Sequence, residues 1–280
     1  MHKIPLDVIQ RALQEDGADY DITTLSTVPA EQQATGTIIA RQAATIAGLC
    51  VAAETFHLLD EHVQVELLVE DGDTVQAGQV LAQLSGSARS LLSAERVALN
   101  FLGRLSGIAS ITARCVRAIE GTRSRILDTR KTTPGLRELE KDAVVLGGGY
   151  NHRFGLSDGV LIKDNHIKAA GGVAQAVKAA RHMAPHLLKI EVECETLAEV
   201  REALEANADV LLLDNMDIER MRSAVELVRR QAPNVLIEAS GNIGTNPERL
   251  AAVAATGVDF ISLGALTHSA PNVDVSLEFA

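Results

Sequence analysis

The stretch DVLLLDN, residues 209–215, decides the class of fold that this chain adopts. Four consecutive apolar residues lie between two aspartates, a run that is too short for a helix and typical of a strand buried on both faces. Such strands belong to parallel sheets that are covered by helices. The stretch therefore predicts a buried parallel strand that ends at the carboxylate of Asp214.

The same pattern recurs on both sides of this stretch, each time followed by a segment of helical character. The other apolar runs are RILD (125–128), GVLIK (159–163), LLKIEVE (187–193), NVLIEA (234–239) and VDFISL (258–263). Six strand–helix units in sequence predict a parallel sheet, closed or doubly wound, and their length and spacing favour a barrel. We expect a β/α barrel over residues 108–268 that is incomplete, with fewer than eight strands.

The first part of the chain has a different organisation. We expect strands at residues 35–41, 63–70 and 79–84, the last two separated by Asp-Gly and Ala-Gly turn signals that are typical of a meander. This pattern predicts an α/β sandwich domain over residues 1–107, which residues 269–280 rejoin.

A long helical segment links the two predicted domains. Residues 87–119 carry apolar side chains at three- and four-residue spacing, which predicts a helix. Gly103 and Gly107 interrupt the pattern, so the segment is expected to be one long or broken helix.

Composition excludes several classes of protein. The chain has 280 residues, 46% of them hydrophobic and only 2% aromatic, so its core must be filled by aliphatic side chains. A formal net charge of -11 argues against a nucleic-acid or anionic-membrane surface, which would need a basic face. The first residues predict a short amphipathic helix, and no apolar run approaches the roughly 20 residues that span a bilayer.

The cysteines indicate the redox compartment. There are three, at positions 50, 115 and 194, and none forms a CxxC pair. We interpret them as reduced thiols of a cytoplasmic protein. Cys194 follows Glu193, but no base stands beside it in the sequence, so it is expected to be a buried small hydrophobe. Arg104, Glu140 and Lys141 are expected to be surface charges.

Polar or glycine residues stand at or just past the end of each predicted barrel strand. They are Arg130, Lys163, Glu193, Asp214, Ser240 and Gly264. The carboxyl ends of barrel strands gather at one mouth, where active sites are built from the loops between strand and helix. Single charges often end strands because loops are solvated, but six in phase favour one shared pocket.

The cations and acids of this set suggest two kinds of ligand. Arg130, Arg153 and Lys163 suit planar carboxylates, because an arginine fork donates two parallel charge-assisted hydrogen bonds to one carboxylate. Glu193 and Asp214 follow neighbouring strands and suit a hydrated Mg²⁺ that also bridges a polyphosphate.

The last two strands are followed by turns that suit a phosphate group. These turns are Ser240-Gly241-Asn242 and Leu263-Gly264-Ala265, at the place where barrels often bind phosphate through backbone N–H groups. One pocket is thus predicted to combine a carboxylate clamp, a metal–diphosphate site and a phosphate cradle.

The chain resembles the quinolinate phosphoribosyltransferase family in an ordered set of motifs. They are DITT, ERVALNFLGRLSGIAS, DTRKTTPGLR, GGGYNHRFGLSDGVLIKDNHI, EVE, LLLDN, EASGNI and DFISLGALTHS, which together cover nearly the whole chain. The resemblance implies a decarboxylating pentosyltransferase of NAD biosynthesis. In this reaction quinolinate attacks C1 of 5-phosphoribosyl 1-diphosphate, diphosphate leaves, and CO₂ is lost to give nicotinate mononucleotide.

The resemblance also implies roles for individual residues, with Mg²⁺ as the cofactor and no organic cofactor. Residues expected to bind quinolinate are Arg96 from a neighbouring subunit of a homo-oligomer, Thr129, Arg130, His152, Arg153 and Lys163. Residues expected around the ribose and diphosphate, with a catalytic role, are Lys131, Glu193 and Asp214. The last two are also expected to hold Mg²⁺, directly or through water. Residues expected at the 5'-phosphate are Ser240, Gly241, Asn242, Gly264 and His268, and Ser262 and Leu263 are also expected to bind 5-phosphoribosyl 1-diphosphate.

Two other functions remain open at this point. An enzyme of the same scaffold acting on nicotinate would need fewer cations than the four at Arg96, Arg130, Arg153 and Lys163. A biotinyl or lipoyl carrier module is suggested by DGDTVQAGQVLAQLSG, but such a module needs a modifiable lysine in its hairpin. The sequence has no lysine between Lys3 and Lys131.

Overall fold

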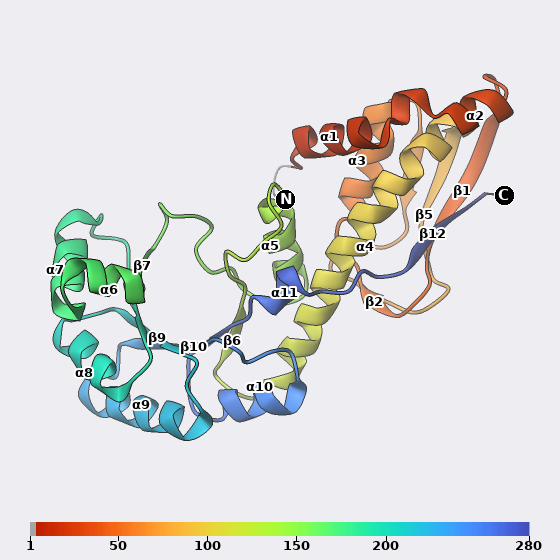
Figure 1. Ribbon diagram of the computed structural model, residues 1–280. Coiled ribbons are helices and arrows are strands. Elements are labelled where there is room, and N and C mark those ends of the chain that lie inside the picture. The colour runs from red at the N-terminus through yellow and green to blue at the C-terminus, as the bar shows by residue number, and fades with distance from the viewer. Residues whose placement is uncertain (1–3, 280) are drawn as a thin grey trace. The chain divides into compact units, whose positions relative to one another are not determined.

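The computed structural model describes residues 4–279, which form two compact units (Figure 1). The amino-terminal unit comprises the chain up to Ala113, Thr133–Gly148 and the residues from Ser269 on. The barrel unit comprises Arg114–Thr132 and Gly149–His268. The expected catalytic domain, 108–268, therefore contains two segments that belong to the other unit, residues 108–113 and Thr133–Gly148.

The barrel unit is built on a parallel six-stranded sheet in the order β6-β11-β10-β9-β8-β7. Its strands are β6 (Arg125–Leu127), β7 (Val160–Ile162), β8 (Ile190–Cys194), β9 (Val210–Asp214), β10 (Leu236–Ser240) and β11 (Phe260–Ser262). Each lies within a predicted apolar run or extends one residue past its end, so the six predicted strands are confirmed. A single parallel bridge from Leu127 to Tyr150 extends the sheet beyond β6. No ladder joins β7 to this extension among the described residues, so the barrel is incomplete, as predicted.

Helices follow the strands of the barrel unit and lie outside them (Figure 1). They are α6 (Asp164–Ala170), α7 (Val173–Met183), α8 (Leu197–Glu205), α9 (Ile218–Gln231), α10 (Pro247–Ala254) and α11 (Ala265–His268). Side chains cap several of them: Asp217 accepts from the backbone N–H of Arg220, and Asn246 from that of Arg249. These caps satisfy N–H groups that a helix start leaves unpaired, and they mark where each loop ends.

The register of the sheet decides which side chains share the barrel interior. Leu212 of β9 pairs with Glu193 of β8 on one side and with Glu238 of β10 on the other. Because side chains alternate along a strand, Asp214 and Ser240 lie on the same face, two residues nearer the carboxyl ends. The parallel register thus brings residues distant in sequence to one mouth.

The amino-terminal unit contains an antiparallel sheet in the order β12-β1-β5-β3. Its strands are β1 (Gln33–Ala40), β3 (Gln64–Leu67), β5 (Val80–Ser87) and β12 (Val275–Phe279), and β2 (Ala44–Thr45) and β4 (Thr74–Val75) form a separate ribbon. The helices are α1 (Leu6–Asp16), the short η1 (Ala18–Tyr20), α2 (Ile22–Thr27), α3 (Leu49–Leu59) and α5 (Arg137–Leu146), with α4 (Ala88–Ala118) continuing past Ala113. The predicted combination of an α/β sandwich with an incomplete barrel is confirmed. No helix among residues 4–279 is long and apolar enough to cross a bilayer.

Of the two alternatives left open for the linking helix, the single long helix is confirmed, because α4 is continuous for 31 residues. Its two glycines serve close packing instead. A Cβ atom at Gly103 would meet the carbonyl oxygen of Val273, and one at Gly107 would meet that of Pro271. The missing side chains therefore let the carboxyl-terminal segment lie against the helix within the amino-terminal unit.

Glu140 and Lys141 are not surface charges, since their exposed fractions are 0% and 1%. The Glu140 carboxylate accepts hydrogen bonds from Arg104 Nη2 at 2.8 Å and from Thr133 Oγ1 at 2.7 Å. Arg104 also donates to the carbonyl oxygen of Ala270 at 3.2 Å. A buried carboxylate requires such partners, and sequence spacing alone did not reveal them.

Replacing Glu140 with Ala is expected to lower the free energy of unfolding by about 3–5 kcal/mol, because it leaves a half-buried guanidinium without its carboxylate. The matched control is Glu138→Ala on the exposed face of the same helix, expected to change stability by about 0.5 kcal/mol or less. Denaturant unfolding of both variants measures the difference. Equal stabilities would show that the Arg104–Glu140 pair contributes nothing.

The cysteines differ in accessibility. Cys115 and Cys194 are buried, and Cys50 is half-buried. Burial raises the pKa of the Cys115 thiol to about 11 and raises the pKa of the Cys194 thiol further. Cys194 is thus the buried small side chain that was predicted. A thiol reagent is expected to label Cys50 alone in the folded protein and all three cysteines after denaturation. Rapid labelling of a native Cys50→Ser variant would contradict this.

Candidate active site

A cavity of about 680 Å³ opens at the carboxyl ends of the barrel strands. The expected site residues that line it are Thr129, Arg130, Lys131, His152, Arg153, Lys163, Glu193, Asp214, Ser240, Gly241, Asn242, Ser262, Leu263, Gly264 and His268. Arg96 is absent from the lining and lies exposed on α4 in the amino-terminal unit. Apart from Arg96, the structure brings every expected residue to one cavity in one unit.

One wall of the cavity is cationic. Arg130 and Arg153 are half-buried, and Arg153 Nη1 donates to the carbonyl oxygen of Gly159 at 2.9 Å. Burial, followed by the neighbouring charge of Arg130, lowers the pKa of Arg153. The Lys163 ammonium lies 2.8 Å from Glu193 Oε2. Two crowded guanidinium groups and a lysine favour an anionic ligand, because an anion relieves their mutual repulsion.

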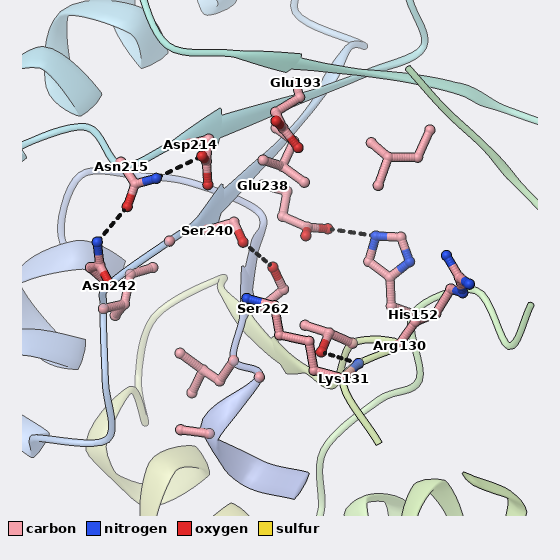
Figure 2. A pocket seen from close by; sticks show the side chains of 18 of the residues that line it. Arg130, Lys131, His152, Glu193, Asp214, Asn215, Glu238, Ser240, Asn242 and Ser262 are labelled. Atoms are coloured by element: carbon pink, nitrogen blue, oxygen red, sulfur yellow. Dashed lines mark hydrogen bonds and ion pairs between the residues drawn. The ribbon is translucent and has the colours of Figure 1, made fainter. Parts of the chain in front are cut away.

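The opposite wall presents acids and amides (Figure 2). Asn215 Nδ2 donates to Asp214 Oδ2 at 2.7 Å, and Asn242 Nδ2 donates to Asn215 Oδ1 at 2.9 Å. Asn215 and Asn242 have positive φ angles, 54° and 45°, and Gly241, which directly precedes Asn242, has a φ of 79°. These backbone conformations turn the loops after β9 and β10 toward each other, which fixes the position of the Asp214 carboxylate.

The third part of the lining comes from the last two strands and the loop after β6. Ser262 Oγ donates to Ser240 Oγ at 3.0 Å, which ties the ends of β11 and β10 together (Figure 2). Thr267 Oγ1 donates to the carbonyl oxygen of Lys131 at 2.7 Å. A Cβ atom at Gly264 would lie 3.0 Å from Lys131 Cδ, so glycine permits this lysine to approach the turn. Lys131 and the turns after β10 and β11 thus line one part of the cavity, and their composition suits phosphate oxygens.

Sequence reasoning missed residues at the floor of the cavity. Glu238 lines it and is 2% exposed, and Glu191 is 7% exposed. With His152 they form a group whose ligand atoms all lie within 4.8 Å of one another. Strand alternation was the available signal, since each glutamate stands two residues from a residue assigned to the site. Asn215, which also lines the cavity, had no comparable signal.

Comparison with protein families accounts for most of the chain. Residues 21–106 match the model of the quinolinate phosphoribosyl transferase N-terminal domain, and residues 108–278 match that of the C-terminal domain. A Bacillus subtilis protein named probable nicotinate-nucleotide pyrophosphorylase (carboxylating) is 48% identical over 94% of this chain and 89% of its own length. A Mycobacterium leprae protein named nicotinate-nucleotide pyrophosphorylase (carboxylating) is 45% identical over 97% of this chain and 96% of its own.

Solved structures give the same result. NadC from Streptococcus pyogenes is 42% identical, with a TM-score of 0.92 over 100% of this chain and 99% of that one. Nicotinate-nucleotide pyrophosphorylase from Ehrlichia chaffeensis is 39% identical, with a TM-score of 0.94 over the whole of both chains. Human nicotinic acid phosphoribosyltransferase is 15% identical with a TM-score of 0.64, which shows a shared fold alone. With both domain models matched and relatives of this similarity, the chain belongs to the quinolinate phosphoribosyltransferase family.

Proposed function

We infer that this chain transfers the phosphoribosyl group of 5-phosphoribosyl 1-diphosphate to quinolinate, with loss of CO₂, to give nicotinate mononucleotide and diphosphate. The observation that carries the inference is one cavity lined both by the Arg130, Arg153 and Lys163 cations and by the turns after β10 and β11, whose composition suits phosphate. Relatives with 45–48% identity are named for the carboxylating reaction. A nicotinate enzyme is the second candidate, because the human nicotinic acid phosphoribosyltransferase shares the fold, but at 15% identity that likeness shows the fold alone.

We assign the cationic wall to the two carboxylates of quinolinate. Arg130 and Arg153 offer forked donors, and Lys163 offers a compact charge. In the ligand-free chain Lys163 is paired with Glu193 at 2.8 Å. A carboxylate that takes over Lys163 releases Glu193, which then faces the ribose and diphosphate. Thr129 and His152 lie beside these groups in the lining.

We assign the remaining lining to 5-phosphoribosyl 1-diphosphate and its Mg²⁺. Glu193 and Asp214 present carboxylate oxygens from neighbouring strands, the donor chemistry that Mg²⁺ prefers. Each already has a protein partner, Lys163 or Asn215, so contact with a hydrated ion that the diphosphate carries fits them better than a closed protein cage. When bound, Mg²⁺ neutralises charge on the departing diphosphate.

The residues of this chain contribute to the reaction mainly by positioning the two substrates. Departure of diphosphate leaves positive character on the ribose, which the carboxylates of Glu193 and Asp214 can stabilise. Lys131 and the turns after β10 and β11 hold the phosphates, so that C1 faces the pyridine nitrogen. Once this nitrogen is alkylated, the bond to the leaving CO₂ breaks with its electron pair left on the ring carbon beside the positively charged nitrogen. A proton from solvent is then added at that carbon to complete the product. No covalent nucleophile is needed.

A single assay tests the inference. Purified protein with Mg²⁺ and 5-phosphoribosyl 1-diphosphate receives either quinolinate or nicotinate, and nicotinate mononucleotide and CO₂ are followed. We expect both products from quinolinate alone. Product from nicotinate instead would preserve the phosphate site and reject the dicarboxylate assignment. Omission of Mg²⁺ is expected to stop turnover.

We further propose a homo-oligomer, at least a dimer, in which Arg96 of one subunit completes the quinolinate site of its neighbour. Arg96 is exposed and does not belong to the lining of its own chain's cavity, which supports this assignment. The protein is proposed to work in the cytoplasm, which its three free cysteines support.

Mixing two inactive variants tests the shared site. Arg96→Ala subunits keep an intact cavity, and Lys131→Ala subunits keep an intact Arg96. In a two-fold dimer formed at random from both, roughly a quarter of the wild-type activity should return, since half of the dimers contain one intact site. No recovery after confirmed subunit exchange would place Arg96 outside the neighbour's site.

A further inference from the structure

Both ring nitrogens of His152 have partners within the barrel unit. Its Nδ1 accepts a hydrogen bond from the backbone N–H of Arg153 at 2.7 Å. Its Nε2 lies 3.1 Å from Glu191 Oε2 and 3.6 Å from Glu238 Oε2. A nitrogen that accepts from an N–H carries no proton, so the ring proton resides on Nε2 and is donated to Glu191.

The backbone around His152 is held just as firmly. The backbone N–H of His152 donates to Asp128 Oδ1 at 2.8 Å, and Asp128 is fully buried at the end of β6. Arg153 follows directly, and its guanidinium is tied to Gly159. The orientation of the His152 ring is therefore coupled to the segment that places Arg153 in the cationic wall.

The carboxyl groups of Glu191 and Glu238 lie close to each other and to His152. One oxygen of each, Oε1, is buried and has no conventional hydrogen-bond partner. Burial, followed by the charge of Glu191, raises the pKa of Glu238 to about 8. Oε2 of each glutamate faces Nε2 of His152, so the pair fixes the direction in which the ring proton is donated.

We propose that Glu191 and Glu238 are positioning residues that hold His152 as a neutral, Nε2-protonated imidazole. His152 then holds the backbone of Arg153 in place through Nδ1 and does not bind a quinolinate carboxylate through a ring nitrogen. The two carboxylates are left to Arg130, Arg153 and Lys163, with Arg96 from the neighbouring subunit. This inference rests on the assignment of Arg153 to quinolinate.

The same three side chains have the chemistry of a metal site, because their ligand atoms lie within 4.8 Å. A protonated Nε2 and a metal-bound Nε2 cannot exist at the same time. A metal bound to Nε2 would displace the proton that Nε2 donates to Glu191. Metal analysis of the purified, active protein is expected to find no stoichiometric ion that survives dialysis, and a retained ion lost in a His152→Gln variant would overturn the proposal.

Nitrogen-15 NMR of histidine-labelled enzyme reads the tautomer directly. The chain has eight histidines, and the His152→Gln variant assigns the signal. We expect an unprotonated Nδ1 and a protonated Nε2 near neutral pH, both in the free enzyme and with quinolinate bound. Protonation of both nitrogens, or of Nδ1 alone, would overturn the proposal whether or not the enzyme turns over quinolinate.

Substitutions of Glu238 separate positioning from a purely structural role. Glu238→Gln keeps a donor and an acceptor in place, whereas Glu238→Met keeps the size and removes both. We expect Glu238→Met to raise the KM for quinolinate by about 10- to 100-fold, as for other carboxylates that orient a histidine. Glu238→Gln should recover most of this loss, and neither variant should change the KM for 5-phosphoribosyl 1-diphosphate.

Controls keep the result interpretable. Glu226→Gln, on the exposed face of α9, is the matched surface substitution, and thermal unfolding checks that each variant is folded. If folded Glu238→Met binds quinolinate normally with an unchanged His152 signal, the proposal is wrong. It is also wrong if the KM values of both substrates rise together while the His152 signal stays unchanged. If wild-type enzyme fails to use quinolinate, the proposed function fails, and the NMR result still decides the tautomer.

Discussion

Replacing Arg130 with Ala is expected to abolish useful turnover, lowering kcat/KM for quinolinate by about 1,000-fold. Arg130 is half-buried, lines the cavity and stands close enough to lower the pKa of Arg153. Loss of one partner from a desolvated charge pair costs about 2–5 kcal/mol, and about 1.4 kcal/mol corresponds to tenfold in rate or affinity. Steady-state kinetics with each substrate varied in turn measures the loss.

Two further variants sharpen this prediction. Arg130→Lys keeps the charge and loses the fork, so it should recover only part of the activity. Arg222→Ala removes an exposed arginine of α9 whose partner is Glu219, and it should behave as wild type. Near-normal kinetics in Arg130→Ala would remove Arg130 from the carboxylate clamp.

Replacing Gly241 with Ala is expected to lower kcat/KM for 5-phosphoribosyl 1-diphosphate by about 100-fold, the cost of a displacement near 1 Å in a positioned site. The φ angle of Gly241 is 79°, a left-handed conformation that costs an alanine about 1–2 kcal/mol. A Cβ atom there would also lie 2.5 Å from Asn215 Oδ1 and 2.6 Å from Asp214 Oδ1. Both side chains must therefore move.

Gly244→Ala is the matched control for this collision. Gly244 also has a left-handed φ, 71°, but a Cβ atom there would meet nothing within 4 Å. The two variants share the backbone strain, so the difference between their kinetics measures the displacement of Asp214 and Asn215. Equal losses of kcat/KM in the two variants would show that activity does not depend on the exact position of the Asp214 carboxylate.

Most of the fold followed from short patterns. The six apolar segments, each four to seven residues long, became the six strands because short apolar segments of this kind are typical of strands buried between helical layers. The residues at the strand ends converged for a topological reason: parallel strands present their carboxyl ends at one edge. Asp214 and Ser240 could thus be placed together although 26 positions, 240 minus 214, separate them.

The predictions that failed depend on what lies opposite a residue in space. Gly103 and Gly107 left open whether the helix is continuous, and the structure shows that they accommodate the carbonyl groups of Val273 and Pro271. Glu140 is buried because Arg104 and Thr133 meet it. Partners distant in sequence, as in the pair of Arg104 and Glu140, cannot be identified from the local pattern of either residue.

The sequence by itself determined the parallel barrel, the family and nearly all of the cavity lining, because alternation, turn chemistry and ordered motifs are properties of short segments. The tertiary structure alone decided which of those side chains are already paired, as with Lys163 and Glu193. It alone placed Glu191 and Glu238 beside His152. Hydrogen bonding and burial depend on distances between strands, and those distances exist only once the sheet has formed.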